Sequence, residues 1–351
     1  MNLRSLCCAT GSLVLIPCFM AAAEGVSSSN SSAPKVDVAQ ATQDWTRIYV
    51  GARPSVSADG KQFVFEWNDR IWIAPTTGGT ARVLAAGDNS RDSWPVLSPD
   101  GKRVAFLSNR MDLENLFELN LENGNLRRVT INSNPPRPYA YASDGKTFVT
   151  TVTRDHADDD HASRLALVSP TGVETVLFDA MASEPTLSPD GTKVLFTRGG
   201  DNIYRKRAKT FSSYAAEIWL YDLQRREFTP VVRNKTDSRS PLWAPNGQGF
   251  YYVSGDGGSK NLHYHALPPA NSSEEKKSLD YKADFAITNF RGDNVLQPTI
   301  SADGHTMVFR QGFDFWRLDL TQPHPKPEFI LLHPDAGWTP HLADIRNRWY
   351  T

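Results

Sequence analysis

Cysteine is scarce in this sequence of 351 residues, and its three cysteines, Cys7, Cys8 and Cys18, all lie near the start. If that segment is removed, the mature chain has no thiol for disulfides, thiol catalysis or cysteine metal sites. An excess of one charge is also missing, since 38 Lys and Arg residues stand against 39 Asp and Glu residues. This balance argues against the basic surface that nucleic acids and anionic membranes attract. We therefore expect no nucleic-acid partner and no stable membrane insertion.

The motifs of common hydrolases are missing as well. The sequence contains no G-x-S-x-G, no H-E-x-x-H, and no S-x-x-K placed with its partners. The segment Gly255–Ser259 has a superficial likeness to the Gly-Asp-Ser-Gly of some serine proteases, but it falls between two expected strands and fits a hairpin turn. We predict no catalytic residue and no cofactor in this chain.

The start of the chain has the features of a targeting segment. A positively charged beginning is followed by the apolar run Leu6–Met20, which is too short for a membrane span, and by an alanine triplet that ends at Ala23. This order predicts a signal peptide over residues 1–23 and a periplasmic or secreted protein. An uncleaved anchor and lipidation at Cys18 are the alternatives. Residues 24–44 are rich in serine and are expected to form a flexible tether.

What the chain does have is one short pattern in six copies. Each copy places an Asp-Gly, or once an Asn-Gly, just before an apolar run, and successive copies lie 41 to 57 residues apart. Repeats of this period indicate a solenoid or a propeller. The predicted turn residues are Asp59 and Gly60, Asp100 and Gly101, Asp144 and Gly145, Asp190 and Gly191, Asn246 and Gly247, and Asp303 and Gly304.

Each copy predicts four strands. Asp-Gly favours a hairpin, because both residues tolerate positive φ, and the run that follows, such as Phe63–Phe65, fits a buried strand. A second hairpin with strands such as Arg70–Ile73 leads through a further glycine turn to a last strand such as Ala81–Leu84. One four-stranded blade cannot bury both of its faces alone. The sequence therefore predicts an all-β, six-bladed β-propeller with four-stranded antiparallel blades over residues 45–332, followed by a tail or the start of another domain over residues 333–351.

A β-sandwich with several similar turns is the alternative fold. Sandwiches lack a four-strand unit at this regular period, which favours the propeller. The segment Arg47–Val50 precedes the first full copy and is a candidate strand for closing the ring. The alternative is a ring that closes by packing alone.

The repeat resembles that of known families. The pattern P-x-x-S-P-D-G-x-x-V-x-F in Pro95–Phe106 resembles the PD40 or TolB-type propeller repeat. The opening stretches Gly51–Ser55 and Phe65–Trp72, with the insertion Ile203–Asp222, are similar to the first, six-bladed propeller of tricorn-type proteases of the S41 family. In that family a second propeller, a PDZ domain and a catalytic core follow, so none of the catalytic residues can be carried over to this sequence.

The tricorn resemblance implies a non-catalytic module of a serine protease. Such a module would dock or gate peptides and would contact neighbouring domains or other copies in a homo-oligomer. The alternative is a stand-alone TolB-like protein-binding propeller of the cell envelope. Only about 20 residues separate Glu24 from Trp45, fewer than the α/β domain of TolB proteins needs. A third reading, the propeller of a prolyl-oligopeptidase-type enzyme, requires a hydrolase domain that this sequence does not contain. All three readings imply peptide or protein partners.

Three clusters are candidate sites. The expected loop 155–161 is rich in carboxylates and imidazoles, which suit divalent cations, although a solvated acidic loop is the plainer interpretation. A basic run in the fourth-copy insertion could receive a peptide carboxylate or an acidic partner, or could be a solvated loop. His263 and His265 alternate along one strand and share a face. The metal candidates are Asp155, His156, Asp158, Asp160 and His161, and the binding candidates are Arg205, Lys206, Arg207 and Lys209.

Overall fold

A computed structural model describes seven stretches of the chain. Its contacts divide the chain after Gln43, and the fold below belongs to the second unit, Asp44–Thr351. The predicted signal peptide, the predicted tether, the acidic loop 155–161 and the basic run 205–209 lie outside the described residues. The described stretches are 47–85, 90–153, 163–199, 215–233, 236–255, 258–267 and 284–336.

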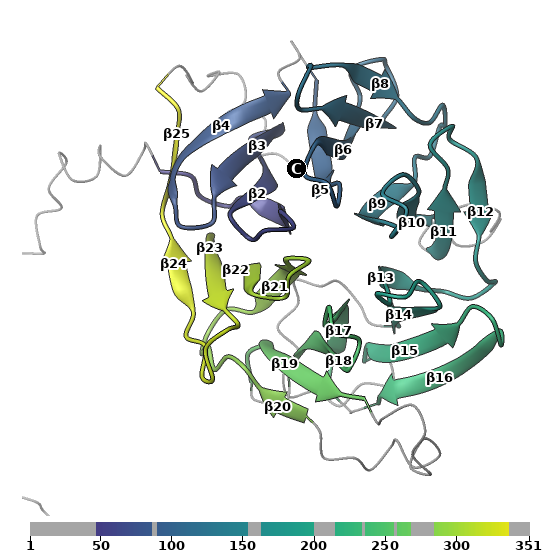
Figure 1. Ribbon diagram of the computed structural model, residues 1–351, viewed down its shortest axis with the longest axis vertical. Coiled ribbons are helices and arrows are strands. Elements are labelled where there is room, and N and C mark those ends of the chain that lie inside the picture. Colours follow the sequence, from purple (N-terminus) through teal and green to yellow (C-terminus); the bar gives the residue numbers. More distant parts are fainter. Residues whose placement is uncertain are drawn as a thin grey trace, which may run out of the picture. The chain divides into compact units, whose positions relative to one another are not determined.

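Six antiparallel sheets stand around a common centre, so the predicted six-bladed propeller is confirmed (Figure 1). In each sheet the four strands follow one another in sequence order from the centre outward. Blades 1 to 3 consist of β1 (Ala52–Val56), β2 (Gln62–Trp67), β3 (Arg70–Pro75) and β4 (Gly79–Ala85); β5 (Asp92–Leu97), β6 (Arg103–Ser108), β7 (Asn115–Asn120) and β8 (Leu126–Arg128); and β9 (Arg137–Tyr141), β10 (Phe148–Val152), β11 (Arg164–Val168) and β12 (Glu174–Val176).

Blades 4 to 6 repeat this order. They consist of β13 (Ser183–Leu187), β14 (Lys193–Arg198), β15 (Glu217–Asp222) and β16 (Glu227–Val232); β17 (Ser238–Trp243), β18 (Gly249–Ser254), β19 (Asn261–Ala266) and β20 (Asp284–Ala286); and β21 (Val295–Ile300), β22 (Thr306–Gln311), β23 (Asp314–Asp319) and β24 (Glu328–Ile330).

The first hairpin of every blade turns at the Asp-Gly or Asn-Gly pair, but the glycine alone takes a positive φ, whereas the prediction rested on both residues tolerating it. In all six copies the glycine N–H donates to the carbonyl three residues earlier, as Gly60 does to Ser57, and the glycine φ lies between 64° and 76°. Only glycine adopts this φ freely, which explains its recurrence. The carboxylate of Asp59 accepts the Ser57 hydroxyl and the Lys61 N–H, and these two hydrogen bonds hold its pKa below the usual value.

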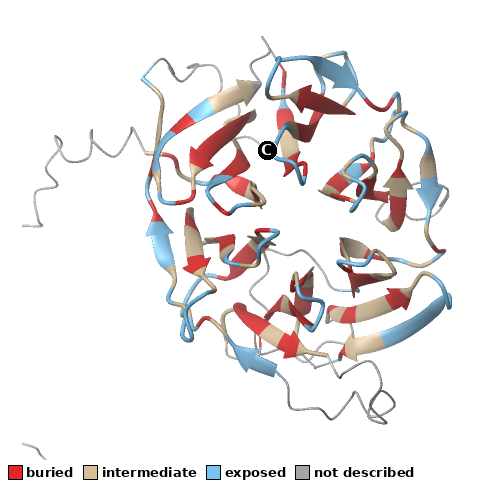
Figure 2. Cartoon of the chain, in the orientation of Figure 1, coloured by how far each residue is buried: buried red, intermediate tan, exposed pale blue. Residues whose placement is uncertain are grey.

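The hydrophobic core is divided among the blade junctions. Six clusters of buried apolar side chains each join two neighbouring blades, and one of them joins blade 6 back to blade 1. Burial is therefore greatest in the inner and middle strands, whereas outer strands such as β8 and β20 are exposed (Figure 2). Each blade covers its two faces with its neighbours, so the ring depends on the closing junction.

Two segments beyond the four-stranded blades join the first and last blades. The short strand β25 (Leu332–Pro334) pairs in parallel with β4, which gives blade 1 a fifth strand that crosses the predicted boundary at residue 332. Residues 47–50 form no strand. Instead, the Ile48 N–H donates to the Leu332 carbonyl at 2.9 Å, and the Val50 N–H donates to the Phe313 carbonyl at 2.8 Å.

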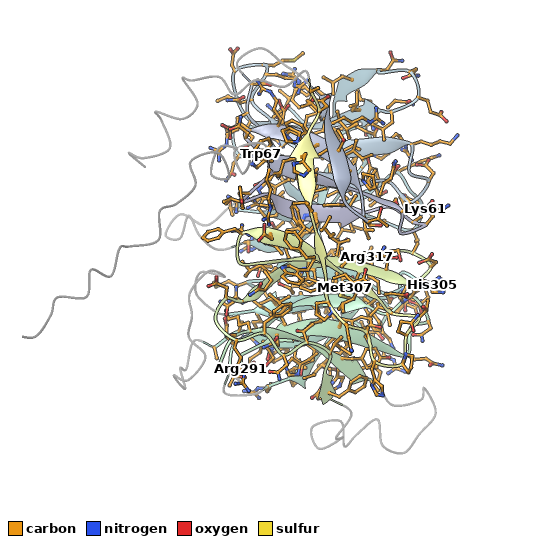
Figure 3. The ribbon with its side chains drawn as sticks, turned by 90° about the vertical axis from the view of Figure 1, so that its left-hand side faces the viewer. Lys61, Trp67, Arg291, His305, Met307 and Arg317 are labelled. Atoms are coloured by element: carbon orange, nitrogen blue, oxygen red, sulfur yellow. The ribbon has the colours of Figure 1, made fainter. Side chains whose placement is uncertain are left out.

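The disc has two different faces. Figure 3 shows Lys61 and His305, beside the Asp-Gly turns, on one side, and Trp67 and Arg291 on the other. Because neighbouring strands run in opposite directions, each inner strand begins near the face that carries Trp67 and Arg291 and ends at the face that carries the Asp-Gly turns. The described residues contain no helix that is long and apolar enough to cross a bilayer.

Candidate binding site on the propeller axis

Two of the sequence-predicted features have structural roles. The Ser259 hydroxyl accepts the Gly292 N–H at 2.8 Å and donates to the Gly292 carbonyl at 3.1 Å, so it anchors a loop. His263 and His265 are both buried in β19, and His265 Nδ1 lies 2.7 Å from the Asp284 carboxylate. Within the described stretches no three His, Cys, Asp or Glu side chains gather as a metal site.

A cavity of about 320 Å³ lies where the six inner strands approach the axis. Every blade contributes one proline to it, and the residues next to the prolines supply polar and aromatic groups. The cavity is lined by Arg53, Pro54, Ser55, Trp94, Pro95, Val96, Pro138, Tyr139, Ser183, Glu184, Pro185, Ser240, Pro241, Leu242, Gln297, Pro298 and Thr299.

A β-bulge in each inner strand builds this wall. The pairing register shifts beside the proline, because proline has no N–H for the ladder. In five blades the residue before the proline has a positive φ of 50° to 55°, which is unusual for residues other than glycine. Blade 3 places Pro138 at this position. The five residues are Arg53, Trp94, Glu184, Ser240 and Gln297.

Side chains from neighbouring blades hold three of these bulges. The Trp94 N–H donates to Glu66 at 2.9 Å, and the Ser240 N–H donates to Glu184 at the same distance. The Arg53 N–H donates to the Gln297 side chain, again at 2.9 Å. Each hydrogen bond joins two adjacent blades, so the cavity wall also links the ring together.

Replacing Glu66 by alanine should lower the free energy of unfolding by about 2 kcal/mol. The substitution leaves the Trp94 N–H without its acceptor and removes the carboxylate that pairs with Arg53 at 2.6 Å. Urea denaturation measures the change. Glu122→Ala breaks an exposed pair with Lys102 and should cost well under about 1 kcal/mol. Equal losses in the two variants would contradict a structural role for the inter-blade hydrogen bond.

The cavity carries opposite charges on opposite walls. Arg53 of blade 1 lies with Cζ 3.9 Å from the Trp94 ring centroid, and Trp94 packs edge-on against Tyr139 at 5.3 Å. Glu184 belongs to blade 4, three blades away around a ring of six. Burial, followed by the Glu184 charge, raises the pKa of Tyr139 to about 12, so its phenol stays protonated. The aromatic rings of Trp94 and Tyr139 therefore lie along the wall between the Arg53 cation and the Glu184 anion.

Sequence reasoning missed this site although part of its signal was visible. The proline belongs to the repeat pattern, but the residue before it changes from blade to blade. The available signal was a residue that varies at a fixed place in a regular repeat. A comparison of that place across the six repeats identifies Arg53, Trp94, Pro138, Glu184, Ser240 and Gln297.

The family model of the tricorn protease N-terminal beta propeller domain matches residues 52–324. The chain belongs to this family. Its tricorn-type propeller is also similar to the Tol-Pal system protein TolB of Francisella tularensis subsp. tularensis, with 26% identity over 254 residues. That alignment covers 70% of this chain and 52% of the relative, so the chain spans about half the length of the curated relatives it matches.

Solved structures agree on the fold of the tricorn-type propeller. The crystal structure of the tricorn protease superimposes with a TM-score of 0.65 and 18% identity, covering 84% of this chain and 27% of that one. A putative TolB from Agrobacterium tumefaciens gives a TM-score of 0.54 at 16% identity, covering 72% and 85% of the two chains. At such identities the likeness concerns the fold alone.

Proposed function

We propose that this tricorn-type propeller is a non-catalytic module that binds peptides or protein segments in its axial cavity. The observation that carries the proposal is the ring of varied polar and aromatic side chains at one fixed position of a regular repeat. A concave site with a few converging polar groups is the usual form of a ligand pocket. Strained backbone at these positions is also typical of functional sites.

The family membership supports a role beside a serine protease of the S41 type. In that role the propeller docks or gates peptides and contacts neighbouring domains or other copies of the chain. The similarity to Tol-Pal system protein TolB supports a second candidate, a protein-binding propeller of the cell envelope. Both roles suit the periplasmic or secreted location that the predicted signal peptide implies.

Binding to short blocked peptides tests the proposal. A panel of N-acetylated, C-amidated peptides Gly-Gly-X-Gly-Gly, with X varied over the natural residues, is titrated into the chain by calorimetry. At least one peptide should bind, and Trp94→Ala should weaken that binding by about tenfold or more, because an aromatic wall of the cavity is lost. The bound peptide should be recovered intact by mass spectrometry.

Trp219→Ala is the matched control for this experiment. Trp219 lies on β15, outside the cavity, where it stacks under Arg198 and donates to Glu217. Its loss should leave peptide affinity unchanged. If no peptide of the panel binds, or if both tryptophan variants weaken binding equally, the axial cavity is not a peptide site.

A further inference from the structure

The two charged residues of the cavity wall, Arg53 and Glu184, differ in whether an ion pair neutralises them. Arg53 is neutralised by Glu66 at 2.6 Å, and its guanidinium face is covered by the Trp94 ring. Among the residues that the structure describes, Glu184 makes no ion pair. One of its oxygens, Oε2, accepts the Ser240 N–H at 2.9 Å and the Thr197 hydroxyl at 2.8 Å. These two donors fix the carboxylate in place.

The second oxygen of Glu184 is therefore available. Oε1 accepts no hydrogen bond from any described residue, and the half-buried side chain lines the cavity. Its surroundings suit an organic cation. Tyr139 stands on the next blade and presents an aromatic ring, while Pro185 and the other prolines provide an apolar wall for an aliphatic stem. Carboxylates and aromatic faces both attract cations.

Three other cationic groups lie nearby. Lys260 and Arg239, on blade 5, share the single carboxylate of Asp237. The charge of Glu184 also acts on Lys260 and opposes the fall in the pKa of Lys260 that burial causes. Arg137 is exposed beside the cavity, with Cζ 5.7 Å from the Trp94 ring centroid. Arg137 is the feature that would favour an anion instead. Its exposure to solvent screens its charge, whereas Glu184 stands inside the cavity wall.

We infer that the axial cavity is selective for a cationic side chain, a lysine or arginine presented by a peptide, whose charged head pairs with Glu184 Oε1. This inference rests on the proposed function and names the ligand chemistry of the same site. A lysine ammonium reaches the free oxygen while its methylene stem packs against Pro185 and Tyr139. A hydrogen bond to a charged partner in such a site changes affinity by about tenfold or more.

Three blocked peptides test the inference. Acetyl-Gly-Gly-X-Gly-Gly-amide with X as Lys, Gln or Glu carries no terminal charge, so only the side chain differs. Calorimetry should give a dissociation constant for the Lys peptide about tenfold or more below that for the Gln peptide, and the difference should shrink as salt is raised. The wild-type chain suffices for this comparison, so the result does not depend on the folding of any variant.

Glu184→Gln identifies the group responsible. The amide keeps an oxygen for the Ser240 N–H, so the variant should melt near the wild-type temperature while losing the preference for Lys over Gln. Glu227→Gln is the matched control, since Glu227 is an exposed residue on β16 of the same blade, and it should keep the full preference.

The outcomes separate the two proposals. Equal affinity for the Lys and Gln peptides, or a preference retained in Glu184→Gln, overturns the cation selectivity while leaving peptide binding in place. Tighter binding of the Glu peptide also overturns it and assigns recognition to Arg137. Binding of none of the peptides, including the wider panel, overturns the proposed function and the selectivity together.

Discussion

Replacing Phe315 by alanine should lower the free energy of unfolding by about 3–5 kcal/mol. Phe315 lies on β23 with 3% of its surface exposed, and its ring packs edge-on against Phe63 and Phe65 of blade 1 at 5.2 and 5.1 Å. Gly51 passes so close that a Cβ there would lie 2.5 Å from the ring. The alanine variant therefore opens a cavity at the junction of the first and last blades.

Urea denaturation followed by near-ultraviolet circular dichroism measures this loss. Phe313→Ala is the matched control, because Phe313 lies in the same hairpin of blade 6 but is 62% exposed. Its replacement should change the free energy of unfolding by less than about 0.5 kcal/mol. Similar stability of the two variants would mean that the junction between blades 6 and 1 contributes little to the closed ring.

Most of the blade architecture could be predicted because its signals are local. The Asp-Gly turn, the apolar run after it and the next hairpin follow one another within a single repeat, and each depends on the conformational preferences of nearby residues. Six repetitions of that unit then determine the propeller. The recurrence of glycine in this turn also reflects a local preference, because glycine adopts the φ of 69° found at Gly60 more freely than other residues do.

Ring closure was less predictable because it depends on contacts between distant segments. Residues 47–50 were a candidate strand, but Val50 has a φ of 59°, far from the negative φ of a regular strand, and the segment forms no strand. The segment is held instead by one hydrogen bond to Phe313 of the last blade and one to Leu332 of β25. The three-residue strand β25 is too short to show a periodic pattern in the sequence. It pairs in parallel with β4, and such a pair is not joined by a hairpin turn that the sequence could reveal.

The axial site was hidden for a related reason. Its residues are ordinary when met one at a time, and Arg53 and Glu184 are separated by three repeats. Only the closed ring places them on opposite walls. Two of the three candidate clusters, the acidic loop 155–161 and the basic run 205–209, remain predictions because they lie outside the described residues.

A chain that begins at residue 51 should be less stable than one that begins at residue 45, by about 3–6 kcal/mol in unfolding free energy. The shorter chain lacks Arg47, Ile48 and Val50. Ile48 is 5% exposed and belongs to the core cluster between blades 6 and 1. Arg47 pairs with Asp314 at 2.5 Å. Two backbone hydrogen bonds to the end of the propeller are also lost.

Calorimetric melting of the two chains measures the effect. The melting temperature should fall by on the order of 5–15 °C in the shorter chain, given the size of the domain. Ile48→Ala in the longer chain distinguishes the contribution of the buried side chain from that of the backbone hydrogen bonds, since it removes most of the former and keeps the latter. It should account for about 2 kcal/mol of the difference, because the isoleucine contacts apolar groups of two blades. If the two chains melt at the same temperature, β25 and the junction core close the ring by themselves, and residues 47–50 only rest upon a ring that is already complete.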